Sequence, residues 1–178
     1  MKRIAMLGLV AALYTALGPN HAPAEVAHQP QCEFPQDLKD EVSIRYPGFT
    51  LVKLADLSAD DKAIFQKDHA SQCPGSASVD FYGDGKPTHA IVLVDKRKKK
   101  ANLIVAHKLG RWELQLLESS DTTPLPVVWR DRPGKYQDVY GEKKLAATHP
   151  VIVLCGYESW AIVYAWTGSK IEKVWISD

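Results

Sequence analysis

Alternation of polar and apolar residues predicts that the second half of the chain consists of β-strands. Residues 111–117 alternate most clearly, because Trp112, Leu114 and Leu116 share one face and polar side chains occupy the positions between them. Residues 151–155 are an uninterrupted apolar run, which is typical of a central strand. The same reasoning predicts further strands at residues 78–82, 88–95, 101–108, 159–166 and 171–176, with a shorter one at 49–54.

Two helices are predicted before most of these strands. Residues 35–46 place Leu38 and Val42 on one face, and a proline–glycine pair follows. A second helix begins with Ser58 as its N-cap and extends to about Gln72.

The order of these elements predicts the α+β class. We expect two N-terminal helices packed on a mainly antiparallel β-meander of about seven strands, because short turns require antiparallel neighbours. The small side chains of 159–166 are expected to support a helix. The elements form one domain at residues 34–178, which follows a flexible leader at residues 25–33.

The N-terminus has the pattern of an export signal. Lys2 and Arg3 precede an apolar stretch, and small residues allow cleavage after Ala24. The sequence therefore predicts a signal peptide at residues 1–24 and a periplasmic or secreted protein without a transmembrane anchor. An uncleaved anchor is the alternative, although the apolar stretch is shorter than the roughly 20 residues that span a bilayer.

Charge gives no argument for nucleic-acid binding, and we expect none. Cleavage removes two positive charges and no negative one, so the formal net charge of +1 becomes −1. The basic run Lys96–Lys100 is either a contact for an anionic partner or a solvated hairpin turn.

Three cysteines follow the predicted cleavage site. Cys32 and Cys73 lie in polar, turn-like surroundings, whereas Cys155 ends an apolar run. Because exported proteins form disulfides, we predict a Cys32–Cys73 bridge and a free, buried Cys155.

The segment 80–88 resembles the calcium loops of FG-GAP and integrin-type repeats. Asp80 and Asp84 match the acidic positions of those loops, whereas Tyr82 replaces an expected Asn or Asp. Calcium is therefore the one cofactor we consider. The alternative is a tight turn in which two glycines adopt positive φ.

The segment 119–150 has little regular patterning, and long segments of this kind are often functional. It is rich in Trp, Tyr and Arg, the residue types enriched at binding hot spots. The alternative is a further strand at residues 127–129. The candidate binding residues are Trp129, Arg130, Asp131, Arg132, Tyr136 and Tyr140, together with Tyr157 and Glu158 beyond the segment.

Catalysis is the less favoured interpretation. Cys155, His149 and Glu158 are close in sequence, but a buried thiol is a poor nucleophile, and no catalytic or metal-binding motif accompanies them. We therefore name no catalytic residue.

Residues 155–160 (CGYESW) and 175–178 (WISD), together with 80–87, resemble a family of uncharacterised secreted bacterial proteins. The resemblance covers most of the predicted domain. It implies no activity, so no residue role follows from it.

These observations predict a secreted or periplasmic binding protein whose partner is a protein. An inhibitor or immunity-type partner of an extracytoplasmic enzyme is one form of this prediction. The alternatives are a small periplasmic hydrolase and a calcium-stabilised structural module. The oligomeric state stays open.

Overall fold

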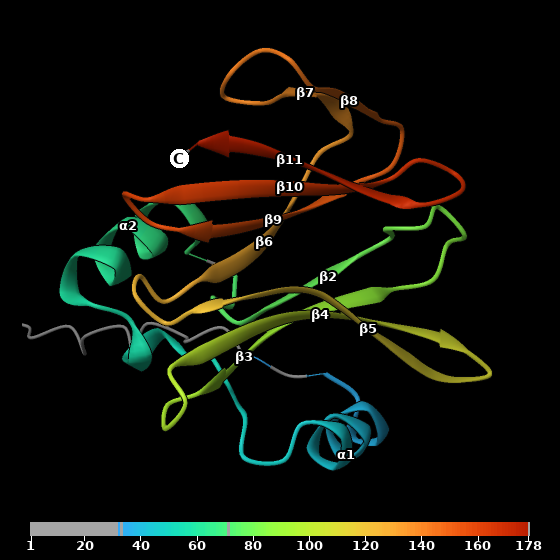
Figure 1. Cartoon of the computed structure of the whole chain (residues 1–178). Coiled ribbons are helices and arrows are strands. Elements are labelled where there is room, and N and C mark those ends of the chain that lie inside the picture. Colours follow the sequence, from blue (N-terminus) through green and yellow to red (C-terminus); the bar gives the residue numbers. More distant parts are fainter. Residues whose placement is uncertain (1–31, 33, 71, 178) are drawn as a thin grey trace, which may run out of the picture.

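The computed structural model describes residues 32, 34–70 and 72–177 (Figure 1). The predicted signal peptide lies outside them, as does the predicted leader apart from Cys32. Strands make up 47% and helices 17% of the described residues. The fold is therefore mostly β, and the α+β prediction is wrong.

The two predicted helices begin and end close to their predicted bounds, as α1 Gln36–Arg45 and α2 Ala59–His69. The 3₁₀-helix η1 Leu54–Asp56 was not predicted, and it begins where the strand predicted at 49–54 was expected to end. Ser58 caps α2, because its hydroxyl accepts a hydrogen bond from the Asp61 N–H at 3.1 Å. No helix in the described part of the chain is long and apolar enough to cross a membrane.

Eleven strands are present in the described residues. In chain order they are β1 Thr50–Leu51, β2 Ser76–Val79, β3 Thr88–Asp95, β4 Lys100–Leu109, β5 Arg111–Asp121, β6 Val127–Asp131, β7 Gly134–Gln137, β8 Lys144–Ala147, β9 Val151–Gly156, β10 Trp160–Trp166 and β11 Ile171–Ser177.

The strands form two facing sheets and a hairpin, not one meander of seven strands (Figure 1). The first sheet has the order β1-β3-β4-β5, and β2 also pairs with β3. The second has the order β11-β10-β9-β6, and β7 pairs only with β8 among the described strands. All of these pairs are antiparallel. The result is a β-sandwich-like fold.

The main core lies between the two sheets. Val92 of β3 and Leu103 of β4 face Ile152 of β9 and Ile162 of β10, and all four are fully buried or nearly so. Phe65 of α2 joins this core, so α2 lies at the side of the sandwich near the turn between β9 and β10 (Figure 1).

A second apolar layer explains why β3 and β4 are apolar on both faces. Ile91, Leu93 and Ile104 point away from the sandwich and pack against Leu38 and Val42 of α1. Burial on two sides requires apolar residues at every position of a strand. The sheet therefore divides the apolar residues between two cores.

The β7–β8 hairpin covers the outer face of the second sheet. Leu145 of β8 packs against Val163 and Ala165 of β10 and Val174 of β11. The expected helix on this small-residue face is therefore absent, because a shallow Val and Ala surface equally accommodates a hairpin.

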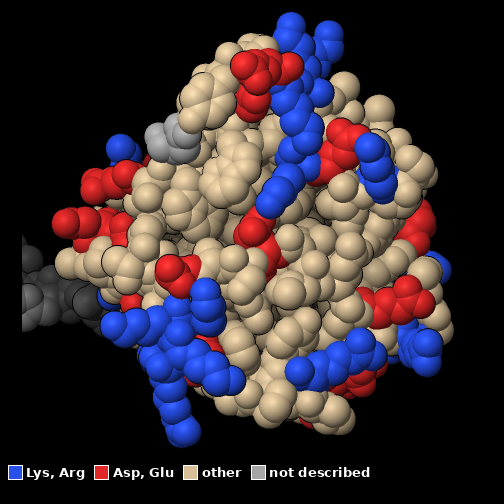
Figure 2. All heavy atoms as spheres, viewed as in Figure 1, with Lys and Arg blue, Asp and Glu red and all other residues tan. Residues whose placement is uncertain are grey.

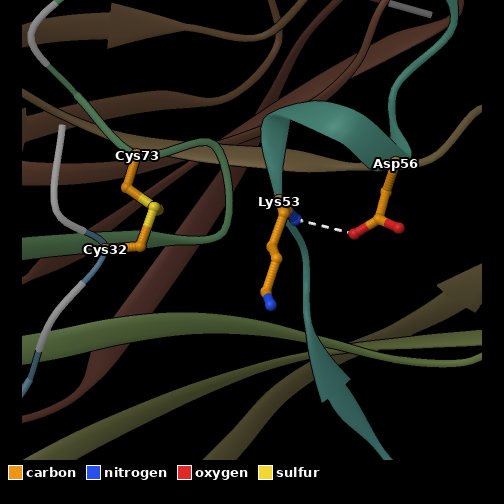
Figure 3. Close-up of a disulfide and its surroundings, with 4 residues drawn as sticks. All are labelled: Cys32, Lys53, Asp56 and Cys73. Carbon is orange, nitrogen blue, oxygen red and sulfur yellow. Dashed lines mark hydrogen bonds between the residues drawn. A yellow bond between two sulfur atoms is a disulfide. The ribbon is translucent and has the colours of Figure 1, made fainter. Parts of the chain in front are cut away.

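The predicted disulfide is present and joins the segment before α1 to the segment before β2 (Figure 3). The Cα atoms of Cys32 and Cys73 are 5.4 Å apart. Close by, the Lys53 N–H donates a hydrogen bond to the Asp56 carboxylate at 2.9 Å (Figure 3). Cys155 forms no disulfide, as predicted, but it is half-buried instead of buried.

Candidate functional site

The predicted binding residues are spread over β6, β7, the segments that follow these two strands and the β9–β10 turn. On β6, the Trp129 ring stacks on His69 of α2 at a centroid distance of 4.5 Å, while Arg130 and Asp131 are exposed. The segment 127–131 is thus a strand that joins α2 to the second sheet, as the alternative interpretation predicted.

The residues after β6 have local structural contacts. The Tyr136 hydroxyl donates a hydrogen bond to the carbonyl of Arg132 at 2.6 Å and closes the turn into β7. Tyr157 and Glu158 lie in the β9–β10 turn, on the α2 side of the sandwich. Burial raises the pKa of the Tyr157 phenol, and Glu158 is exposed at a positive φ of 58°.

The acidic residues of the loop at 80–88 hold the loop closed. Asp80 accepts a hydrogen bond from the Gly85 N–H at 3.3 Å, and Asp84 accepts one from the Lys86 N–H at 3.0 Å. The hydrogen bond from Lys86 is the main reason why the pKa of Asp84 is lowered. The described residues contain no group of three His, Cys, Asp or Glu side chains placed to hold a metal ion.

The basic turn at residues 96–100 is largely paired. Lys96 contacts Asp56 at 2.7 Å, Lys98 contacts Asp95 at 3.5 Å, and Lys100 reaches a third acid, Asp121, at 3.1 Å. These contacts favour the interpretation as a solvated hairpin turn.

The residues considered for catalysis are not assembled. His149 packs against Gly83 at one end of β9, whereas Cys155 lies at the other end of the strand. Burial, followed by the nearby Asp61 charge, raises the pKa of the Cys155 thiol to about 11. A thiol with this pKa is protonated at neutral pH and is a poor nucleophile.

Four exposed apolar side chains lie on β11 or on the loop that folds over its edge; two others in the second half of the chain, Leu109 and Leu116, lie on β4 and β5. We call Val139, Tyr140, Trp175 and Ile176 the Trp175 surface, and their exposed fractions are 44%, 72%, 40% and 39%. A hollow of about 480 Å³ lies in it, lined by Tyr140, Trp175 and the side chains Asp138, Lys143, Lys173 and Val174. Around the position of β11, Figure 2 shows uncharged side chains beside a column of basic ones.

The backbone beneath the Trp175 surface is fixed by the loop between β7 and β8. This loop folds over the outer edge of β11, and the Val139 N–H donates a hydrogen bond to the Trp175 carbonyl at 2.9 Å. The Lys143 ammonium donates to the Lys173 carbonyl at 2.6 Å. Because these bonds occupy edge carbonyls, a partner meets side chains here instead of an open strand edge.

A polar contact in the core supports the same surface. The Tyr164 hydroxyl donates a hydrogen bond to Glu118 at 2.7 Å, and the Lys173 ammonium contacts the same carboxylate oxygen at 2.5 Å. Burial, followed by the Glu118 contact, raises the pKa of Tyr164. The Lys173 ammonium also lies 5.7 Å from the centre of the Trp175 ring, so the core contact helps to orient the surface.

A second hollow, of about 570 Å³, lies at the opposite end of β10. Its walls are Tyr82, which lies in the loop at 80–88, and Trp166, which ends β10. His107 of β4 also lines it. The Tyr82 ring stacks on His107 at 4.6 Å and meets Trp166 edge-on at 5.1 Å. We call this the aromatic cleft.

Of the residues at these two hollows, only Tyr140 was among the predicted binding residues. Trp175 was placed in the strand predicted at 171–176, with no binding role. Tyr82 was noted only as a departure from a calcium loop. No protein-family model, curated protein or solved structure matches the chain.

Proposed function

We propose that this chain is an exported binding protein that contacts a protein partner through the Trp175 surface. The observation that carries the proposal is the pair of exposed aromatic side chains, Tyr140 and Trp175, that line one hollow on a backbone that the β7–β8 loop holds in place. Exposed apolar clusters of this kind mark interaction sites, and Trp and Tyr dominate binding energies at interfaces.

The surroundings of the surface favour a partner with acidic groups beside an apolar centre. Lys143 and Lys173 line the hollow next to Tyr140 and Trp175. Lys173 is paired with Glu118, and Asp138 lines the same hollow, so the preference for an acidic partner depends mainly on Lys143. Lys143 bonds a neutral carbonyl, and Glu172 offsets part of its charge. An extracytoplasmic enzyme that this protein inhibits is one partner of this kind.

The disulfide supports the proposed location. Disulfides persist in oxidising compartments such as the periplasm, and the chain carries a Cys32–Cys73 bridge. Together with the signal-peptide pattern at residues 1–24, the bridge supports a partner that lies outside the cytoplasm.

Site-specific photo-crosslinking in the exporting cell tests the proposal. A photoreactive residue at Val139 is expected to form one discrete adduct with a protein. The same residue at Ile44, which is 75% exposed on α1, serves as the control and is expected to form none. The adduct at Val139 is expected to disappear in Trp175→Ala protein whose circular dichroism is unchanged.

Two results would overturn the proposal. One is an identical set of adducts at Val139 and Ile44. The other is an adduct at Val139 that persists at full yield in folded Trp175→Ala protein, because truncation of a central tryptophan commonly costs 2 kcal/mol or more, about a thirtyfold loss of affinity.

A further inference from the structure

The aromatic cleft has a floor built from two paired strands. Val105, His107 and Leu109 of β4 alternate onto one face of the first sheet, and Glu113 and Gln115 of β5 lie beside them. In the register of the sheet His107 is opposite Glu113, and Val105 is opposite Gln115. The turns after β2, β4 and β10 all lie at this end of the sandwich (Figure 1).

The aromatic wall is held in place from behind. Gly83, which follows Tyr82, has a φ of +71° and lies so close to His149 that an added Cβ would be 2.1 Å from the imidazole. Tyr82 is also fixed by His107 and Trp166 on its two sides. The rings are therefore positioned by the fold before any ligand arrives.

The charged groups at the cleft are carboxylates. Glu113 lines it and is exposed, and Asp84 lies beside it with one oxygen 3.2 Å from Nε2 of the buried His107. No Lys or Arg is among the described residues that line the cleft. Lys86 offsets part of the Asp84 charge, so Glu113 is the main negative charge at the cleft.

We propose that the aromatic cleft binds a small organic cation that carries a primary or quaternary ammonium group. The negative faces of Trp and Tyr rings attract such cations, most strongly where water is partly excluded. Glu113 supplies the opposite charge, and Gln115 supplies an amide for a polar substituent. The volume of about 570 Å³ lies within the range of small-molecule sites. This site is separate from the Trp175 surface.

Calorimetric titration of the whole exported protein with choline tests the inference. The matched control ligand is 3,3-dimethylbutan-1-ol, in which carbon replaces the charged nitrogen and the shape is kept. Choline is expected to bind at one site per chain, and the neutral alcohol is expected to bind at least about tenfold more weakly. Equal affinity for the two ligands would overturn the inference, as would binding of a neutral disaccharide but not choline.

Two variants locate the binding. Glu113→Gln keeps the size of an exposed side chain and is expected to weaken choline binding about tenfold, because it removes the carboxylate. Asp121→Asn removes a charge from the far end of the same strand and is expected to leave binding unchanged. Equal affinities for choline in wild type and Glu113→Gln would place binding elsewhere and overturn the inference, as would a complete absence of choline binding in the wild type.

Discussion

At the residue scale, the partly buried carboxylate of Glu118 on β5 contacts side chains of both β10 and β11. Its oxygen accepts a hydrogen bond from the Tyr164 hydroxyl at 2.7 Å and contacts the Lys173 ammonium at 2.5 Å. Tyr164 is only 2% exposed, so no solvent is at hand to replace Glu118 as the partner of its hydroxyl. A buried polar group without a partner costs more than a hydrogen bond between exposed groups contributes.

We therefore predict that Glu118→Ala lowers the free energy of unfolding by about 2 kcal/mol, mainly because the Tyr164 hydroxyl loses its acceptor. The ion pair between Glu118 and Lys173 contributes little of this loss, because both side chains are partly exposed and solvent screens their charges. Urea denaturation followed by circular dichroism measures the effect. Glu113→Ala, on the same strand but exposed, is the control and is expected to change stability by less than about 0.5 kcal/mol. Equal losses in the two variants would contradict the argument.

At the element scale, periodicity located most strands but not their distribution between sheets. The prediction of a strand at 88–95 matches β3. However, Ile91 and Val92 are both apolar, and only the structure assigns one to α1 and the other to the sandwich. Local pattern contains no information on which strand faces which, so one meander was expected where two sheets form.

The short strands were missed for a different reason. β7 and β8 have four residues each, and β7 begins at Gly134, which has no side chain to contribute to a pattern. The sites followed the same rule. Tyr140 was predicted to bind from its residue type, whereas Trp175 lines a hollow with it only because a loop distant in sequence folds over β11.

The turn between β2 and β3 gives a prediction at this scale. Gly83 and Gly85 both have positive φ, at 71° and 76°, but a Cβ at Gly83 would overlap His149, and one at Gly85 meets nothing within 4 Å. We predict that Gly85→Ala costs about 1 kcal/mol, from backbone strain alone. Gly83→Ala is expected to cost about 1–3 kcal/mol more, because the imidazole must move.

Thermal and urea unfolding of the two alanine variants measure this difference. Each variant is the control for the other, since both introduce the same side chain at a similar φ. A Gly83→Ala protein as stable as Gly85→Ala would show that His149 shifts at no cost. In that case the Tyr82 wall of the aromatic cleft would lack the support described above.

At the scale of the whole molecule, the disulfide joins the N-terminal elements to the sandwich. The bridge spans a sequence separation of 41 residues, which includes α1, β1, η1 and α2. Phe65 of α2 and Leu38 of α1 enter different cores, so the same loop supplies both. A cross-link of this span lowers the conformational entropy of the unfolded chain and thereby stabilises the native state.

We predict that replacing Cys32 and Cys73 together by serine lowers the free energy of unfolding by about 4 kcal/mol, the loop-entropy value for this span. Cys155→Ser is the control, since it removes a thiol outside the loop.

Thiol counting checks the pairing independently. Of the three cysteines, one is expected to react in oxidised protein in denaturant, and all three are expected to react in reduced protein. In the folded oxidised protein that thiol is expected to react slowly, because burial raises the pKa of Cys155 to about 11. Three reactive thiols in denatured protein recovered from the periplasm would contradict the bridge and remove the support that it gives to an oxidising location.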